Sequence, residues 1–151
     1  MMSKGKAMVE VRFYDQADDE LLKFAVLIAR SGGKWVFCRH RDRSTLEFPG
    51  GHREAGEDIA ETARRELMEE TGAASFSISP ICVYSVTRSA EAGETVEETF
   101  GMLYAAEVES FEAELHSEIE EIYLQDELPD NWTYPQIQPK LLEEAKRRGF
   151  L

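Results

Sequence analysis

The sequence predicts a layered domain of mixed α/β class, in which polarity-alternating strands are interrupted by a strong amphipathic helix. Three observations lead to this prediction. Apolar residues recur at every second position near the N-terminus, two short and strongly apolar segments flank a glycine turn, and residues 58–72 carry apolar side chains at helical spacing. Helices separated by groups of antiparallel-looking strands favour a sheet that is layered with helices.

The first half of the chain predicts three strands. Val9, Val11 and Phe13 alternate with polar neighbours, which indicates a strand with one buried face. The segment 22–30 is short and almost wholly apolar, as expected of a strand that is covered on both sides. A Ser-Gly-Gly turn joins it to the segment 34–40, so that the two are predicted to form a β-hairpin.

Residues 58–72 predict the best-defined helix of the chain. Asp58 with Glu61 fits a capping box, and Gly72 is placed to end the helix in a left-handed conformation. The residues expected to face the core recur every four positions, with two more beside them: Ile59, Ala63 and Leu67, flanked by Ala60 and Met68.

The remaining elements are shorter or less regular. Residues 41–56 carry one proline and several glycines and are expected to be irregular, and residues 91–94 are a candidate loop. The other predicted elements are strands at 75–88, 95–108 and 121–125 and a final helix at 137–148.

Length and charge limit the classes of function. A chain of 151 residues is about one domain long, and we expect a single domain over residues 1–151. The net charge of −13 argues against a nucleic-acid backbone or an anionic membrane as a partner. A small phosphorylated substrate remains compatible, because bound metal ions can invert the local field.

The cysteines and the N-terminus predict a soluble, cytoplasmic protein. Cys38 and Cys82 are the only cysteines, too few for a disulfide framework, and we expect both to be buried free thiols. The N-terminus lacks the apolar core of a signal peptide. The longest apolar run, residues 24–29, is far shorter than a membrane span.

Three glutamates crowd one side of the predicted helix. Glu66, Glu69 and Glu70 stand three, four and one residues apart, and like charges at such spacings cost an isolated helix about 0.2–0.5 kcal/mol per pair. A solvated acidic face would be the simpler interpretation of a charge cluster. The repulsive spacing instead predicts a bound cation, and a hard divalent ion prefers carboxylate oxygens.

The segment 51–73 resembles the complete signature of the Nudix hydrolases. This resemblance implies an α/β/α sandwich with a mixed β-sheet and hydrolysis of phosphoric anhydride bonds in a nucleoside diphosphate linked to another moiety. The matching positions, which include the fixed glycines, glutamates and arginine of the signature, are Gly51, Glu57, Arg65, Glu66, Leu67, Glu69, Glu70, Gly72 and Ala73.

The resemblance also implies roles for these residues. Glu66, Glu69 and Glu70 would be the catalytic metal ligands for Mg²⁺, with Mn²⁺ as a substitute, and the Gly50 carbonyl would be a further ligand. Arg65 would pair with Glu57 and hold the loop–helix geometry that orients these ligands. The segment 46–51, LEFPGG, resembles the MutT-type branch, which converts nucleoside triphosphates into monophosphate and pyrophosphate.

The signature does not fix the catalytic base. Family members take this residue, or an extra metal ligand, from a glutamate elsewhere, and in MutT-type members it precedes the last strand. Glu118 is our prediction, with Glu120 and Glu121 available in the same segment and Glu97 and Glu98 in another.

Substrate contacts are predicted in three segments of the chain. Arg39 leaves the second hairpin strand just before the glycine loop, and Gly51 lets the backbone approach a phosphate. Trp132 and Tyr134 precede the last helix, where they would line a base pocket or else pack in the core. The partner is expected to be a small nucleotide, with ADP-ribose, a nucleotide sugar, a dinucleoside polyphosphate or a non-catalytic nucleotide-binding role as the alternatives. The sequence does not predict an oligomeric state.

Overall fold

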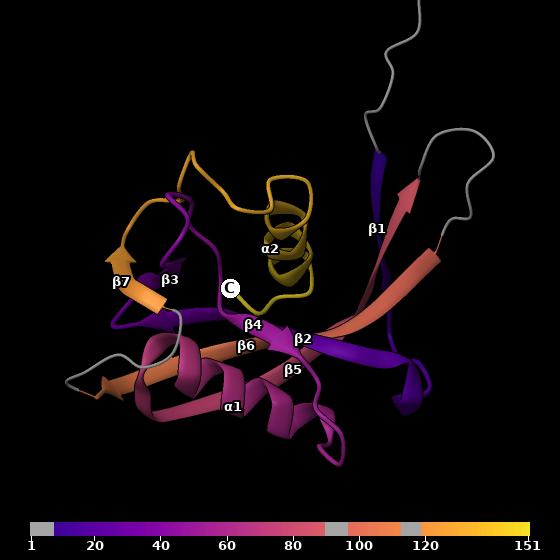
Figure 1. Cartoon of the computed structure of the whole chain (residues 1–151), viewed down its shortest axis with the longest axis horizontal. Coiled ribbons are helices and arrows are strands. Elements are labelled where there is room, and N and C mark those ends of the chain that lie inside the picture. Colours follow the sequence, from indigo (N-terminus) through magenta and orange to yellow (C-terminus); the bar gives the residue numbers. More distant parts are fainter. Residues whose placement is uncertain (1–7, 90–96, 113–118) are drawn as a thin grey trace, which may run out of the picture.

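A mixed sheet lies between two helices in the computed structural model, which describes residues 8–89, 97–112 and 119–151 (Figure 1). The sheet has the order β1-β5-β6-β2-β3-β7, with β4 paired to β2 off this path. The pairing of β2 with β6 is parallel and the other pairings are antiparallel. The predicted mixed α/β class with helices on both faces is therefore confirmed.

The elements agree closely with the predicted ones. The structure adds a short 3-10 helix, η1 (Asp19–Leu21), and the three-residue strand β4 inside a segment that we expected to be irregular. The elements are β1 (Met8–Tyr14), β2 (Leu22–Ser31), β3 (Lys34–His40), β4 (Gly50–His52), α1 (Ile59–Thr71), β5 (Ala73–Ser89), β6 (Glu97–Phe111), β7 (Ile119–Gln125) and α2 (Gln138–Arg147). The candidate loop at 91–94 lies outside the described residues.

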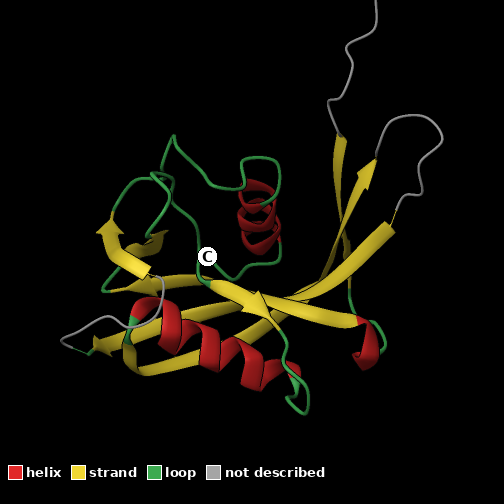
Figure 2. Cartoon of the chain, in the orientation of Figure 1, coloured by secondary structure: helices red, strands yellow, loops and turns green. Residues whose placement is uncertain are grey.

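Strand β2 is covered on both faces, as its apolar sequence predicts. Ala25 and Leu27 are fully buried in the cluster that packs against α1, whereas Ile28 is buried in the cluster that packs against α2. Alternate side chains of a strand point to opposite faces, so this one strand contributes to both cores. Figure 2 shows the two longer helices on opposite sides of the strands.

Helix α1 begins and ends as predicted. Asp58 accepts a hydrogen bond from the Glu61 amide while the Glu61 side chain accepts one from the Asp58 amide, so the capping box is complete. Gly72 adopts φ 73°, where a side chain would be strained. Ala63 and Leu67 are fully buried, but Met68 is half exposed and does not belong to the buried stripe.

The hairpin of β2 and β3 opens immediately after its turn, and this divergence positions the site. Only Arg30–Trp35 and Ser31–Lys34 are paired in the hairpin. Residues 46–52 enter the gap: the Cys38 amide donates to the Glu47 carbonyl on one side, and β4 pairs with β2 on the other. The backbone of Leu46 also bonds to residues 131 and 133, which brings the loop before α2 alongside.

The two cysteines are buried free thiols, as predicted. Among the described residues, no helix has the length and apolar character needed to cross a membrane.

Candidate active site

An acidic cleft lies between the inserted loop and α1. It encloses about 400 Å³, and the side chains of Glu66, Glu69 and Glu70 line it together with His40 and Arg65. The loop contributes Gly50, Gly51 and His52. The structure thus brings the three clustered glutamates of the sequence to the glycine segment, as their predicted roles require.

Arg65 organises this cleft. Its Nε and Nη2 donate to the two carboxylate oxygens of Glu57 at 2.6 and 3.1 Å, a bidentate pair. Its Nη1 donates to Glu66 Oε2 at 3.0 Å and to Glu69 Oε1 at 2.9 Å, and its Nη2 also reaches the His52 carbonyl at 2.9 Å. One guanidinium therefore ties the loop to the helix.

The ion pair changes the protonation of Glu57. Its hydrogen bonds from Arg65, followed by that from the Glu54 amide, lower the pKa of Glu57 to about 2. The Thr62 hydroxyl donates to the same carboxylate at 2.8 Å. Glu57 therefore stays ionised at every ordinary pH and holds Arg65 in place.

The carboxylates of the cleft are crowded. Burial, reinforced by the charge of Glu70, raises the pKa of Glu66 to about 7. Glu70 is itself buried and accepts a hydrogen bond from the Gly50 amide at 2.8 Å. A Cβ atom on Gly51 would overlap the Glu66 carboxylate, so glycine at this position lets the loop lie directly against the acid.

His40 lines the cleft and Glu47 lies beside it, which adds two residues to those predicted to hold a metal. His40 Nε2 lies 3.2 Å from Glu70 Oε2 and 3.4 Å from Glu47 Oε2, and the hydrogen bond with Glu70 raises the pKa of His40. Glu47 is buried, which raises its pKa. His40 and Glu47 come together only because the loop that carries Glu47 pairs with β3.

The donor set fits a hard divalent cation. Ionising several carboxylates in a half-buried cleft is unfavourable, and oxygen-coordinated cations relieve that repulsion. Within the described residues no three acidic, histidine or cysteine side chains already converge as a metal cluster. Arg65 and the Gly50 amide donate hydrogen bonds to the carboxylate oxygens instead.

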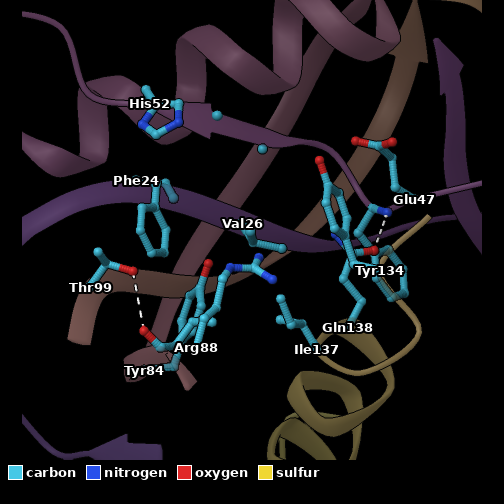
Figure 3. A pocket seen from close by; sticks show the side chains of 15 residues that line it. Phe24, Val26, Glu47, His52, Tyr84, Arg88, Thr99, Tyr134, Ile137 and Gln138 are labelled. Atoms are coloured by element: carbon cyan, nitrogen blue, oxygen red, sulfur yellow. Dashed lines mark hydrogen bonds between the residues drawn. The ribbon is translucent and has the colours of Figure 1, made fainter. Parts of the chain in front are cut away.

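A second, apolar pocket adjoins the cleft. It encloses about 350 Å³ and shares Gly50, Gly51 and His52 with the acidic cleft. Phe24, Tyr84 and Tyr134 are among its walls (Figure 3). The two hollows therefore adjoin each other at the glycine segment, one acidic and one aromatic.

The remaining predicted residues have different surroundings. Arg39 is held by Glu121 at 3.1 Å and by the Arg43 carbonyl, and lines neither hollow, so its substrate contact stays a prediction. Trp132 packs on Phe37, as in a core.

Two of the alternative candidates for the catalytic base form contacts with other residues. Glu118 lies outside the described residues. Among the alternatives to Glu118, Glu98 of β6 accepts hydrogen bonds from the hydroxyls of Tyr14 in β1 and Ser85 in β5. Glu121 forms an ion pair with Arg39.

The mixed sheet between two helices, with a glycine loop facing a glutamate-bearing helix, defines the class of the Nudix hydrolases. The NUDIX domain model matches residues 20–145, and the chain belongs to the Nudix family. Members of this family use divalent metal ions and act on small nucleotides.

Three similar proteins agree with this assignment. A crystal structure of a mutant of the Bacillus subtilis pyrophosphohydrolase BsRppH has a TM-score of 0.76 and 30% identity, covering 98% of this chain and 97% of that one. A UDP-X diphosphatase structure has a TM-score of 0.66 at 18% identity, covering 84% of this chain and 62% of that one, and supports the fold alone.

The third is a Bacillus subtilis (strain 168) protein with the description "Putative 8-oxo-dGTP diphosphatase YtkD". It is 42% identical over 78 residues, which are 52% of this chain. The match spans about half the length of that relative, 49%.

Proposed function

We propose that the protein is a Mg²⁺-dependent pyrophosphohydrolase that cleaves nucleoside triphosphates to monophosphate and pyrophosphate. The observation that carries this proposal is that the two hollows adjoin each other at the glycine segment. A phosphate chain laid along Gly50–Gly51 would place its diphosphate in the acidic cleft and its base in the aromatic pocket. The descriptions of the two Bacillus subtilis relatives, a pyrophosphohydrolase and an 8-oxo-dGTP diphosphatase, support a purine triphosphate, including an oxidised one.

The proposed reaction is attack of water at phosphorus with pyrophosphate as the leaving group. Bound Mg²⁺ would neutralise the phosphate oxygens and lower the pKa of the attacking water. Glu66, Glu69, Glu70 and the Gly50 carbonyl would hold the metal. Arg65, fixed by Glu57, would keep the loop and helix in register, and backbone at Gly51 would lie against the phosphate chain.

The proposal also covers the catalytic base, the choice of metal, the domain organisation and the location of the protein. We keep Glu118 as the base, Mn²⁺ as a substitute metal, a single domain over residues 1–151 and a cytoplasmic location as predictions. A nucleotide and the carboxylates of the cleft are both negatively charged. We therefore expect the nucleotide to bind this protein of charge −13 only when the cation is present, which makes substrate binding metal-dependent.

The test is a hydrolysis panel with product identification. The purified protein is incubated with Mg²⁺ and dGTP, 8-oxo-dGTP, dATP, ADP-ribose, a UDP-sugar or a dinucleoside polyphosphate, and the products are separated by chromatography. We expect monophosphate and pyrophosphate from triphosphates, with no turnover when the metal is chelated. Turnover of only ADP-ribose, the UDP-sugar or the dinucleoside polyphosphate would contradict the proposed substrate class. Tight nucleotide binding without any product would contradict the proposed hydrolytic activity.

A further inference from the structure

Arg88 is the one arginine or lysine among the residues that line the apolar pocket. It lies near the end of β5, and Figure 3 shows its guanidinium pointing into the hollow between Val26 and Ile137. Its neighbours there are aromatic rings and aliphatic side chains. Arg88 is exposed to solvent, so its guanidinium donors are open to a ligand.

Within the described part of the chain, no hydrogen bond or ion pair holds the Arg88 side chain. Glu97 is its direct cross-strand partner in β6, yet the two side chains form no ion pair. Arg65 and Arg53, in contrast, are both tied to carboxylates and carbonyls. In a protein of charge −13, an arginine left without a carboxylate has its donors available for a ligand.

Two further side chains of the pocket can donate, while Glu47 adds an acceptor to its lining. The Gln138 amide oxygen accepts from the Phe48 amide at 2.8 Å, which leaves the side-chain NH₂ to donate. The Tyr134 hydroxyl oxygen accepts from Arg43 at 3.4 Å and keeps its own proton to donate. The pocket thus combines aromatic walls with converging donors, which suits a flat ring that carries acceptors along one edge.

We propose that Arg88 determines base specificity by donating to the oxygen and ring nitrogen on the edge of a 6-oxopurine. Guanine and hypoxanthine present two acceptors, O6 and N7, that match the fork of a guanidinium. Adenine presents an amino group at position 6, so a donor would face a donor and remain unpaired. This inference rests on the proposed function, because it assumes that the base of a nucleotide occupies this pocket.

The experiment compares dITP with dATP, which differ in the oxo or amino group at position 6 and the N1 proton that accompanies it. We measure kcat/KM for both with the wild type and with Arg88→Met, which keeps an unbranched apolar side chain and removes the donors. We expect the wild type to favour dITP. Arg88→Met should lower kcat/KM for dITP by about tenfold or more and leave that for dATP nearly unchanged.

The control is Arg12→Met, which removes an exposed arginine from the neighbouring strand β1 outside both hollows. It should leave the dITP/dATP ratio as in the wild type. Equal losses of both substrates in Arg88→Met would indicate a structural or phosphate-binding role and would overturn the proposal, as would no change at all.

Binding of the products separates this inference from the reaction. Calorimetry with dIMP and dAMP in the presence of Mg²⁺ needs no turnover. If the wild type binds dIMP more tightly than dAMP and Arg88→Met loses this difference, recognition of the base by Arg88 is supported even if no triphosphate is cleaved. Turnover of triphosphates with equal binding of dIMP and dAMP would overturn base reading and leave the proposed function standing.

Discussion

The acidic cleft and the apolar pocket share three backbone residues but are held together by different forces. The cleft depends on charge: Arg65 bonds to three glutamates and to the loop carbonyl at His52. The pocket depends on packing, with Phe24 and Tyr84 rings in contact at 5.5 Å between centroids. Changes in the cleft should therefore affect metal and chemistry, whereas changes in the pocket should affect substrate choice.

The largest expected effect is that of Glu70→Gln in the cleft. The amide keeps the shape of the side chain but removes a charge from the proposed metal site, and metal-assisted charge stabilisation contributes several kcal/mol to such reactions. We expect kcat to fall by about three orders of magnitude or more. Steady-state assays with Mg²⁺ measure this, and thermal denaturation checks that the variant remains folded.

The control for this variant is Glu143→Gln, an exposed glutamate of α2 outside both hollows. It removes the same charge and should retain wild-type kcat. A Glu70→Gln protein that remains folded and active would show that the cleft is not the site of the chemistry.

Gly51→Ala tests the cleft from the loop side. Its Cβ would overlap the Glu66 carboxylate, so the acid must move away from its position beside Arg65. We expect the half-saturating Mg²⁺ concentration to rise and activity at low Mg²⁺ to fall by about 10–100-fold, the range for groups that orient metal ligands. Titration of activity with Mg²⁺ measures this, and an unchanged titration would mean that Glu66 is not a ligand.

Gly101→Ala is the matching substitution in the pocket. Its Cβ would overlap the Phe24 ring, which forms one wall of the hollow. We expect KM for nucleotide to rise about fivefold, which is what a displaced apolar contact of about 1 kcal/mol gives. Both kcat and the Mg²⁺ titration should stay near wild type, and a rise in the Mg²⁺ requirement would show that the two hollows are not separable.

The smallest effect concerns pH. The pKa of Glu66 is about 7, above its ordinary value, so this acid is protonated below pH 7 and must lose its proton to bind a metal. Metal affinity should therefore fall as pH drops from 8 to 6. The free energy of unfolding of the metal-free protein should change in the opposite direction and rise as pH drops. A carboxyl group whose pKa is raised in the folded state contributes stability that is lost as pH rises through 7.

Calorimetry in buffers of different ionisation enthalpy measures this linkage. It should detect proton release on Mn²⁺ binding near pH 6.5 in the wild type and less in Glu66→Gln. Metal binding with no proton release at that pH would contradict the protonated state of Glu66.

The cleft could be predicted from the sequence because most of its residues lie within one loop and one helix. Glu66, Glu69 and Glu70 are placed by helical spacing alone, and the capping box and Gly72 fix where that helix begins and ends. Because helical geometry depends on residues close in sequence, the spacing of these residues is enough to predict how they are arranged.

The pocket could not be predicted in the same way. Phe24, Arg88 and Gln138 come from β2, β5 and α2, and only the pairing order of the sheet brings them together. The placement of His40 beside Glu47 and Glu70 could not be predicted for the same reason, since the opening of the hairpin beyond Ser31 depends on long-range packing. The short strand β4 is fixed by its partner β2 rather than by its own sequence.

A crystal structure with Mn²⁺ and a non-hydrolysable dGTP analogue tests the division between the two hollows most directly. Anomalous scattering locates the metal independently of the nucleotide. We predict Mn²⁺ on the carboxylates of Glu66, Glu69 and Glu70, with the diphosphate beside Gly50–Gly51 and the base between the aromatic walls. Metal bound away from these glutamates, or a base outside the pocket, would contradict this account.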